Sequence, residues 1–361
     1  MLLHNLRVSA GVSTYVMNYY RLIDHKRFHI DFAVWKDVPT CYYDEIAKNG
    51  SKVYVLPSVK YLLEHIRECR KILSHSNYDI IHDNSLMITY PMMLVSKDYV
   101  GVRILHSHSA KVGETMLKEK RNKLFSPLLL KTANHYVACT TKAGKALFGD
   151  RSFDVVPNII NVDAFKFNEI TREKIRKSYN CKDKIIIGSV GRLTDLKNPF
   201  FAMGVINKIV DSVPNVEYWW IGSGVLDEPV AEYVKKKGLS ERVRLFGSRN
   251  DISELYQAMD VFFLPSKSEG FGLACLEAQA AGLQCVVSDE FPEDVNVTGN
   301  VTFVSLDERI SGWTRALTSK FGRSFNRSDG YDLVKKSPYS DKSEGNELAA
   351  LYLKYLRAPK G

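Results

Sequence analysis

The fold is decided by the stretch "SEGFGLACLEAQAAG", residues Ser268–Gly282. It follows a short apolar run and continues into a segment rich in alanine, which predicts a buried strand, a glycine turn and a closely packed helix. Gly270 and Gly272 allow a sharp turn of the backbone. Glu269 and Glu277 flank this turn at a spacing of eight residues. The stretch therefore predicts one carboxylate at the mouth of the turn and another along the helix.

The turn itself predicts a binding site for an anion. The helix that begins near Gly272 directs the positive end of its dipole and its unpaired N–H groups at the turn. A phosphate would repel nearby carboxylates, so hydroxyl groups are the natural partners of Glu269 and Glu277. A nucleotide-diphosphate sugar, with phosphates in the middle and hydroxyls on both sides, fits this layout. Ordinary surface glutamates would not explain why both carboxylates and both glycines flank one turn.

Strand and helix patterns alternate along the whole chain. The short apolar, β-branched runs are "FHIDFAVW", "SKVYVLP", "YDIIHDN", "VRILHSH", "HYVACT", "KIIIGSVG", "VEYWWIGSG", "VRLFG", "VFFLPS" and "QCVVSD". Longer amphipathic segments separate them, and this alternation is typical of parallel sheets with helices on both faces. The predicted fold class is therefore α/β. Site residues are expected in loops that follow strands, because ligands bind at the carboxyl ends of open parallel sheets.

The length of 361 residues favours two domains with separate cores. A Pro-Asn turn within "VVPNIINVDAFKF" ends one series of strands and helices, and a new strand begins at Lys184. We predict domains over residues 1–158 and 159–335, followed by a C-terminal segment over residues 336–361 that returns to the first domain. Apolar residues at helical spacing predict a helix in that segment: Leu348, Leu351, Tyr352 and Tyr355.

The composition narrows the classes of partner and location. A net charge of +9 is compatible with nucleic acid, an anionic membrane or an anionic small substrate. Nucleic acid is disfavoured because the chain has no P-loop, zinc or RNP-like signature and its basic residues are spread. Six cysteines without a CxxC pair predict buried thiols in a reducing compartment. The sequence has neither a run of 18 apolar residues nor a signal-peptide pattern, so a cytoplasmic protein is expected.

A second loop after a predicted strand carries two cations. Arg192 and Lys197 lie in "GRLTDLKN", directly after the run "KIIIGSV". Together they could bind a diphosphate through charge-assisted hydrogen bonds. Taken alone, such a pair is more typical of a solvated basic loop, so its role depends on the surrounding pattern.

Four stretches of the C-terminal half occur in a characteristic order: "VPNIINVDAFKF", "SVGRLTDLKNP", "PNVEYWWIGSG" and "VRLFGSRNDISELYQAMDVFFLPSKSEGFGLACLEAQAAGLQCVVSD". This half resembles the retaining GT-B glycosyltransferases of the GT4 class, which carry the E-x7-E motif, and specifically those of bacterial capsule and exopolysaccharide synthesis. The resemblance implies two Rossmann-like doubly wound domains that face a central cleft. The first domain would bind the acceptor and the second the nucleotide-sugar donor.

The resemblance also implies roles for residues of the second domain. Arg192 and Lys197 would hold the donor diphosphate and stabilise it as a leaving group. Glu269 would bind hydroxyls of the transferred sugar, and Glu277 would bind those of the ribose. Further donor contacts are implied at Gly270, Phe271, Gly272 and Leu273, whose backbone would line the sugar and phosphates, and at Arg249 and Asn250 of "GSRND", which would border the nucleobase.

The resemblance is weaker in the first domain. Gly11 lies in "SAGVSTYVMNYYR", which is similar to the family's first glycine loop, although Ala10 stands where a second glycine is common. There, Gly11 would let the backbone approach donor and acceptor. The stretch "RILHSHS" is similar to the strand end that carries a functional histidine. His108 is favoured over His106 for that role because it lies nearer the strand end, and His106 is expected to pack in the core.

The implied reaction moves a sugar from a nucleotide-diphosphate sugar, with a UDP-sugar favoured, and retains the configuration at the anomeric carbon. No cofactor or metal is expected, because the chain has no D-x-D triplet and no His or Cys cluster with metal-ligand spacing. Two alternatives use the same architecture: a nucleotide-sugar epimerase, and a non-catalytic GT-B subunit that binds a partner transferase. The joint presence of Arg192, Lys197, Glu269 and Glu277 favours the transferase.

The acceptor is expected to be a saccharide or a saccharide linked to polyprenyl diphosphate. The stretch "KVGETMLKEKRNKLFSPLLLKTAN" of the first domain places cations before the apolar run from Leu124 to Leu130. This pattern is compatible with peripheral contact with anionic lipid at the inner face of the plasma membrane. It is equally compatible with a helix whose charged end is solvated and whose apolar end is buried. The cations are Lys118, Lys120, Arg121 and Lys123.

Overall fold

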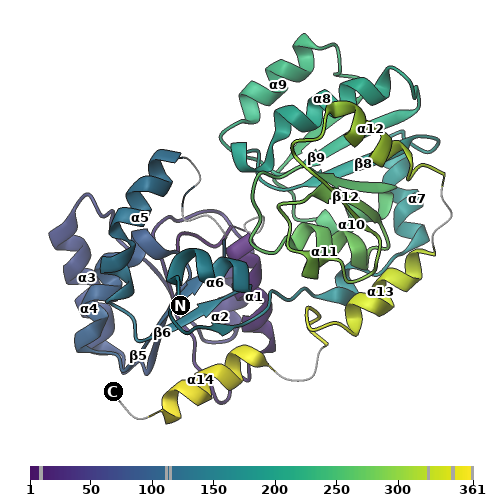
Figure 1. Ribbon diagram of the computed structural model, residues 1–361. Helices are drawn as coiled ribbons and strands as arrows, with labels where there is room; N and C mark the ends of the chain where they lie inside the picture. The colour runs from purple at the N-terminus through teal and green to yellow at the C-terminus, as the bar shows by residue number, and fades with distance from the viewer. Residues whose placement is uncertain (8–10, 110–112, 114–115, 323–325, 343–345, 359–361) are drawn as a thin grey trace. The chain divides into compact units, whose positions relative to one another are not determined.

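The computed structural model in Figure 1 describes residues 1–7, 11–109, 113, 116–322, 326–342 and 346–358. The chain forms two compact units, one of residues 1–158 with 344–361 and the other of residues 159–343. The C-terminal segment expected over 336–361 is divided between them, since the second unit extends to residue 343. The helix of that segment, α14, covers Glu347–Arg357.

The first unit is built on a seven-stranded sheet in which every strand pair is parallel. The strand order is β3-β2-β1-β4-β5-β6-β7, so the winding reverses between β1 and β4. The strands are β1 (Leu2–Leu3), β2 (Phe32–Val34), β3 (Val53–Val55), β4 (Ile80–Asp83), β5 (Val102–Ser107), β6 (His135–Ala138) and β7 (Asp154–Val155). In open α/β sheets such a reversal is where ligands bind, beyond the carboxyl ends of the strands.

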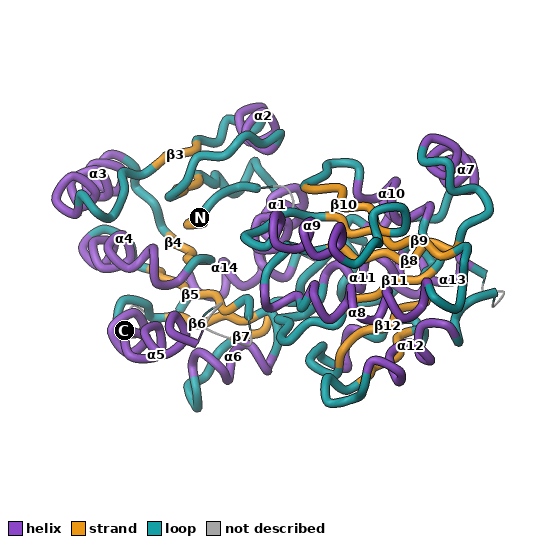
Figure 2. Tube along the Cα trace, turned by 90° about the horizontal axis from the view of Figure 1, so that it is seen from above, coloured by secondary structure: helices purple, strands orange, loops and turns teal. Residues whose placement is uncertain are grey.

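Helices cover both faces of this sheet. They are α1 (Gly11–Leu22), α2 (Tyr42–Lys48), α3 (Leu62–His75), α4 (Tyr90–Val95), α5 (Met116–Leu130), α6 (Thr141–Phe148) and α14, with 3₁₀ turns at Leu86–Thr89 and Ser96–Asp98. Figure 2 shows α3, α4 and α5 on one side of the sheet and α1, α6 and α14 on the other. Helix α14 buries the side chains whose spacing predicted it: Leu348, Leu351, Tyr352 and Tyr355.

The second unit repeats the same winding. Its six-stranded parallel sheet has the order β10-β9-β8-β11-β12-β13, with the reversal between β8 and β11. The strands are β8 (Ile185–Val190), β9 (Val216–Ile221), β10 (Val243–Gly247), β11 (Val261–Leu264), β12 (Gln284–Ser288) and β13 (Val301–Val304). Four of these strands are buried at nearly every residue, because helices cover both faces.

The helices of the second unit form two layers around the sheet (Figure 1). Helices α8 (Pro199–Val210), α9 (Asp227–Lys236) and α12 (Ile310–Thr318) pack together on one side. The other side carries α7 (Glu169–Ser178), α10 (Ile252–Ala258), α11 (Leu273–Ala280) and α13 (Arg327–Lys335). Three 3₁₀ turns complete the unit at Val162–Phe165, Asp195–Lys197 and Glu293–Val295. The predicted α/β class with two doubly wound parallel sheets is confirmed.

All ten runs predicted as strands contain a strand, whereas β1, β7 and β13 were not predicted. Strands β1 and β7 have only two residues each, too few for a pattern to appear. All six cysteines are free thiols; five are buried and Cys41 is exposed. Across the part of the chain that the structure describes, no helix combines the length and apolar content that a membrane span requires.

Candidate functional site

In the second unit, backbone contacts at glycines join the carboxyl ends of three neighbouring strands. The N–H of Gly222 donates to the carbonyl of Gly247 at 2.8 Å, and the Trp220 indole donates to the carbonyl of Gly191 at 2.9 Å. Gly222 has φ +132°, and a Cβ there would lie 2.2 Å from the Gly191 oxygen. Only glycine permits this approach. The loop after β8, which carries the exposed Arg192, is therefore held by its backbone.

The loops after β8 and β11 are held together at the point where the strand order reverses. The N–H of Lys267 donates to the carbonyl of Leu196 at 2.7 Å, and its ammonium pairs with Asp195 at 2.7 Å. A second ion pair joins Lys197 Nζ to Glu269 Oε1 at 2.5 Å. Two residues predicted from separate motifs, 72 positions apart, thus meet at the switch point of the sheet.

Glu269 is nearly buried, with 7% of its surface exposed. Besides Lys197, the Ser266 hydroxyl donates to its carboxylate at 2.7 Å. These are the hydrogen bonds to the Glu269 carboxylate found among the described residues, and both are accepted by Oε1. The Oε2 atom is consequently the one that can accept a hydrogen bond from a ligand hydroxyl without displacing either partner.

The glycine turn places helix α11 directly after Glu269. Gly272 caps the helix with φ +96°, and a Cβ at this position would lie 2.5 Å from the Phe291 ring. The preceding Phe271 is buried and packs on Tyr339, with ring centroids 4.5 Å apart. These contacts position the backbone from Gly270 to Leu273 and the first N–H groups of α11 at the same end of the sheet as the ion pair.

Glu277 lies along α11 and is half-buried. The Tyr256 hydroxyl lies 3.1 Å from its Oε2 atom and 2.9 Å from the carbonyl of Ala274. Burial raises the pKa of Glu277 to about 7, and the hydrogen bond from Tyr256 opposes that shift. At neutral pH this carboxyl is therefore close to half ionised. A ligand hydroxyl that donates to it would favour the ionised form.

The loop after β10 carries the residues expected beside a nucleobase. Arg249 donates to both carboxylate oxygens of Asp251, at 2.8 and 2.6 Å, and this bond lowers the pKa of Asp251. Asn250, between them, is exposed. The Arg249 guanidinium is thus engaged within its own loop, so a contact between Arg249 and a base would have to share or replace the pair with Asp251.

The predicted residues of the first unit lie around the end of β5. His108 is half-buried; its Nε2 lies 2.9 Å from Asn84 Oδ1 and its ring stacks on His106 with centroids 4.0 Å apart. Burial lowers the pKa of His108 to about 3, so the ring is neutral at physiological pH. His106 is fully buried, as a packed core histidine would be. Gly11 is the exposed first residue of α1, and its neighbour Ala10 lies outside the described residues.

The second unit thus gathers Lys197, Glu269, Glu277 and the turn from Gly270 to Leu273 at one end of its sheet, with Arg192 and Arg249 in loops at that same end. Gly11 and His108 belong to the other unit. Sequence reasoning did not identify Ser266, Tyr256 or Asn84 as partners of these residues. Asn84 had a signal, since it directly follows a predicted strand. Ser266 had the same signal, since it lies in the loop after another predicted strand, three residues before Glu269. Tyr256 had none, because only the folded chain brings it to Glu277.

No group of three or more His, Cys, Asp or Glu side chains with the arrangement of a metal site occurs among the residues the structure describes. The cations of the site are side chains, and the glycine turn adds backbone N–H donors.

Comparison with known proteins agrees with this arrangement. Residues 171–307 match the family described as "Glycosyl transferases group 1". EpsF of Bacillus subtilis (strain 168), whose name assigns it to the glycosyltransferases, is 29% identical over 321 residues, covering 85% of this chain and 84% of EpsF. The UDP-Gal:alpha-D-GlcNAc-diphosphoundecaprenol alpha-1,3-galactosyltransferase of Escherichia coli is 25% identical, covering 81% of this chain and 77% of that enzyme.

Among solved structures, Anabaena HepE in complex with UDP and glucose superimposes with a TM-score of 0.80. The match covers 98% of this chain and 99% of HepE at 16% sequence identity, so it speaks for the fold alone. The resemblance to GT4-type glycosyltransferases that the sequence motifs indicated is confirmed by the family match, the curated relatives and the fold together. The match to the group 1 glycosyl transferases lies in the second unit, over residues 171–307, and the chain as a whole has the GT-B fold.

Proposed function

We propose that this chain is a retaining glycosyltransferase of the GT4 class that moves a sugar from a nucleotide-diphosphate sugar, most naturally a UDP-sugar, to a saccharide or polyprenyl-diphosphate-linked saccharide in capsule or exopolysaccharide synthesis. The observation that carries the proposal is the pair of Lys197 and Glu269 at the switch point of the second sheet, beside the N-terminus of α11. One cation, one set of backbone donors and one carboxylate acceptor are what a sugar diphosphate requires at its reacting end.

In this proposal, the positive groups stabilise the leaving diphosphate. Lys197 and Arg192 donate to its oxygens together with the first N–H groups of α11, each charge-assisted hydrogen bond contributing roughly 1.5 to 3 kcal/mol. Negative charge develops on the diphosphate as its bond to the sugar breaks, and these positively charged side chains and N–H groups stabilise it without having to move. No metal is needed for that neutralisation. The acceptor hydroxyl attacks from the face that the diphosphate leaves and passes its proton to the departing phosphate oxygen, which retains the anomeric configuration.

The two carboxylates bind hydroxyls at either end of the donor. Glu269 accepts from the transferred sugar through Oε2, because Oε1 is engaged by Lys197 and Ser266. Glu277 accepts from the ribose and is drawn into its ionised form by doing so. Asn250 and the backbone of its loop border the base, and Arg249 joins them when it exchanges its pair with Asp251. Gly11 and His108 of the first unit serve the transfer from the acceptor side.

The names of related proteins support the substrates. The Escherichia coli relative is named for a UDP-galactose donor and a diphosphoundecaprenol-linked acceptor, and HepE was crystallised with UDP and glucose. We extend both to this chain as a UDP-sugar donor and a lipid-linked acceptor. A lipid-linked acceptor would bring the enzyme to the inner face of the plasma membrane from the cytoplasm.

Helix α5 favours contact with that membrane. Leu124 is 75% exposed, Phe125 47% and Leu128 48%, whereas Leu129 and Leu130 are buried. The apolar end of the helix is therefore only partly buried, which departs from the alternative of a wholly buried apolar end. Cations near an anionic surface contribute about 1 kcal/mol each. The described cations beside the apolar group are Lys120, Arg121 and Lys123, and the side chain of Lys118 lies outside the described residues.

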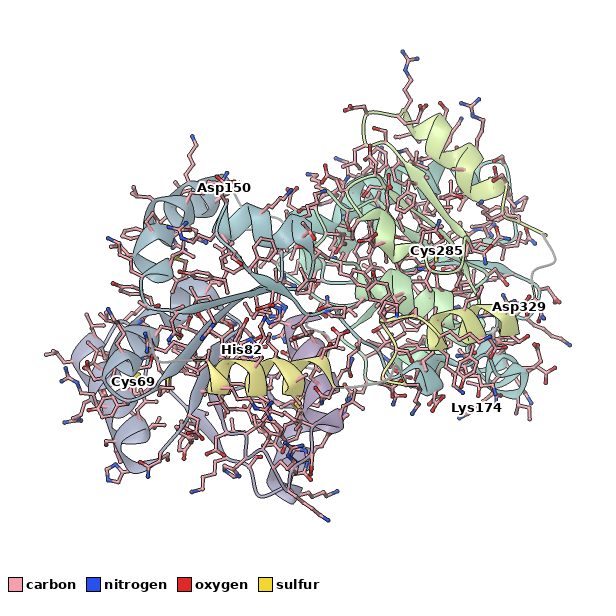
Figure 3. All side chains as sticks on the ribbon, turned by 60° about the horizontal axis from the view of Figure 1, so that its bottom comes forward. Cys69, His82, Asp150, Lys174, Cys285 and Asp329 are labelled. Carbon is pink, nitrogen blue, oxygen red and sulfur yellow. The ribbon has the colours of Figure 1, made fainter. Side chains whose placement is uncertain are left out.

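The test is a panel of UDP-, GDP-, ADP- and dTDP-sugars, assayed by calorimetry and by hydrolysis with and without a saccharide acceptor. We expect binding of one UDP-sugar, with transfer only when acceptor is present. Lys197→Ala and Glu269→Ala should each reduce turnover at least a hundredfold. The matched control is Lys174→Ala, because Lys174 forms a surface pair with Glu254 at 3.9 Å on α7 (Figure 3).

Several outcomes would contradict the proposal. Turnover that survives both site substitutions would remove the assignment of the donor site. Formation of an epimerised sugar nucleotide without acceptor would favour the epimerase, and donor binding without turnover in any combination would favour a non-catalytic subunit. Proton NMR of the product gives its anomeric configuration, and an inverted product would exclude retention. Loss of activity in a chelating buffer that is restored by a divalent cation would exclude metal independence.

A further inference from the structure

We propose that Asn84 holds the His108 ring in one tautomer, with Nε2 protonated and Nδ1 presented as an acceptor for a substrate hydroxyl, and that Tyr352 positions the plane of this ring through His82 and His106. The proposal rests on the proposed transferase activity for the identity of the substrate, while the tautomer stands on the structure of the first unit. Neither residue belongs to the motifs that carried the family resemblance.

The contact between Asn84 and His108 sets the position of the ring proton. An amide oxygen has lone pairs and no hydrogen, so Nε2 of His108 has to donate across the 2.9 Å contact to Asn84 Oδ1. The orientation of the amide is supported independently, since its Nδ2 donates to the carbonyl of His82 at 3.3 Å. A neutral imidazole carries one proton, so a proton on Nε2 leaves the lone pair on Nδ1.

Two more histidines support the ring from one side. His106 lies parallel to His108, with centroids 4.0 Å apart and planes 18° apart, and His82 is stacked on His106 at 5.2 Å and 6°. His82 Nε2 lies 3.0 Å from His106 Nδ1, and its Nδ1 lies 2.7 Å from the Tyr352 hydroxyl. The Tyr352 hydroxyl is thus the hydrogen-bond partner of His82 Nδ1, and His82 Nε2 in turn is the partner of His106 Nδ1. Tyr352 thereby fixes the plane on which His108 rests.

The C-terminal helix thus contributes to a site that the first 158 residues form. Tyr352 lies on α14, and Figure 3 shows His82 beside this helix. The series of contacts from Tyr352 through His82 and His106 to His108 joins α14, β4 and β5. It consists of two hydrogen bonds and one ring stack, so a change in α14 can alter the plane of the His108 ring.

The surroundings keep all three rings neutral. Burial lowers the pKa of His108 to about 3, and it lowers the pKa values of His82 and His106 well below the ordinary range. Tyr15 of α1 also packs on His108, at 4.8 Å between centroids, and burial raises its pKa, so it is neutral as well. A neutral acceptor suits a hydroxyl donor and disfavours a carboxylate.

The test is nitrogen NMR of the full chain labelled at the histidine rings, with His108→Gln to assign the signal. In the unsubstituted protein we expect His108 to show a protonated Nε2 and a bare Nδ1 at neutral pH. Asn84→Leu should convert the signal to a mixture of tautomers and lower kcat/KM about tenfold, or about 1.4 kcal/mol. Asn84→Asp keeps an acceptor at this position, so the protonated Nε2 should return at neutral pH.

The tyrosines of α14 provide a matched pair. Tyr352→Phe should shift the His106 and His108 signals, because it removes the hydrogen-bond partner of His82 Nδ1. Tyr355→Phe should leave them unchanged, because the Tyr355 hydroxyl donates to Asp154 and its ring stacks on His135. His135 serves as the internal reference signal in the Asn84 and Tyr352 variants, but not in Tyr355→Phe, which changes the ring stacked on it.

A proton on Nδ1 of His108, or a doubly protonated ring at neutral pH, would overturn the tautomer. An unchanged His108 signal in Asn84→Leu would overturn the role of Asn84, and equal effects of the two tyrosine substitutions would overturn that of Tyr352. A chain that shows the expected tautomer but transfers no sugar from any donor would leave the positioning in place and refute the proposed function instead.

Discussion

The titration of Glu277 makes donor binding depend on pH. Its pKa is raised to about 7 by burial in the free protein. If the donor binds only when this carboxylate can accept hydroxyls in its ionised form, the apparent association constant follows the ionised fraction. That fraction is about 0.09 at pH 6 and about 0.91 at pH 8 for a pKa of about 7. Donor affinity should therefore rise about tenfold from pH 6 to pH 8, or about 1.4 kcal/mol.

Isothermal titration calorimetry with the intact nucleotide-sugar tests this in buffers of different ionisation enthalpy. Binding at pH 6 should release about 0.9 proton per donor, and binding at pH 8 about 0.1, because the group is already ionised at the higher pH. The nucleotide-sugar is preferable to the free nucleotide. The terminal phosphate of the latter titrates near pH 6 and would add its own protons.

Glu277→Gln is the matched variant, since the amide has the same shape and no charge. It should bind the donor more weakly at pH 8 and show no pH dependence between 6 and 8. Asp83 also has a pKa of about 7, raised by burial, but it lies in the first unit and should titrate alike in both proteins. Affinity that is equal at the two pH values, or a pH dependence that persists in the variant, would refute the reasoning.

Two further predictions concern stability and membrane contact. Gly272→Ala should lower the free energy of unfolding by about 2 to 5 kcal/mol, because φ is positive and the new Cβ would lie 2.5 Å from the Phe291 ring. Gly299→Ala should lower it by about 1 to 2 kcal/mol, because φ is +74° but the space around the new Cβ is open. Thermal unfolding measures both. Replacing three cations of α5 by glutamine should abolish sedimentation with anionic vesicles at low salt, a loss of about 3 kcal/mol. They are Lys120, Arg121 and Lys123.

Specific outcomes would contradict the predictions on stability and membrane contact. Equal destabilisation by the two glycine substitutions would mean that the turn relaxes away from Phe291 and that the close contact has no energetic effect. Failure of the unsubstituted protein to bind anionic vesicles at any salt concentration would remove the lipid contact. Binding that is unchanged by the triple substitution but lost in Leu124→Ser would assign it to the apolar side chains of α5 alone.

Local patterns in the sequence were sufficient to predict the fold class and ten of the strands. Buried parallel strands read as apolar runs whatever their neighbours are, so ten of them were visible, and the turn at Gly270 and Gly272 followed by an alanine-rich helix was visible for the same local reason. Burial does not explain why strand β13 was missed, since β13 has one buried residue of four, whereas β3 has none and β10 has one of five, and both of these were predicted.

The contacts between the polar side chains of the site arise only in the folded chain. Lys197 and Glu269 are 72 residues apart and come together because β8 and β11 are neighbours at the reversal of the sheet. The pKa of Glu277 depends on its burial beside Tyr256, and the tautomer of His108 depends on Asn84 from the adjacent strand. Periodicity reports on local burial, whereas strand order, desolvation and hydrogen-bond direction arise from residues that are distant in the chain. The ion pair, the pKa of Glu277 and the tautomer of His108 therefore depend on how distant segments of the chain pack together.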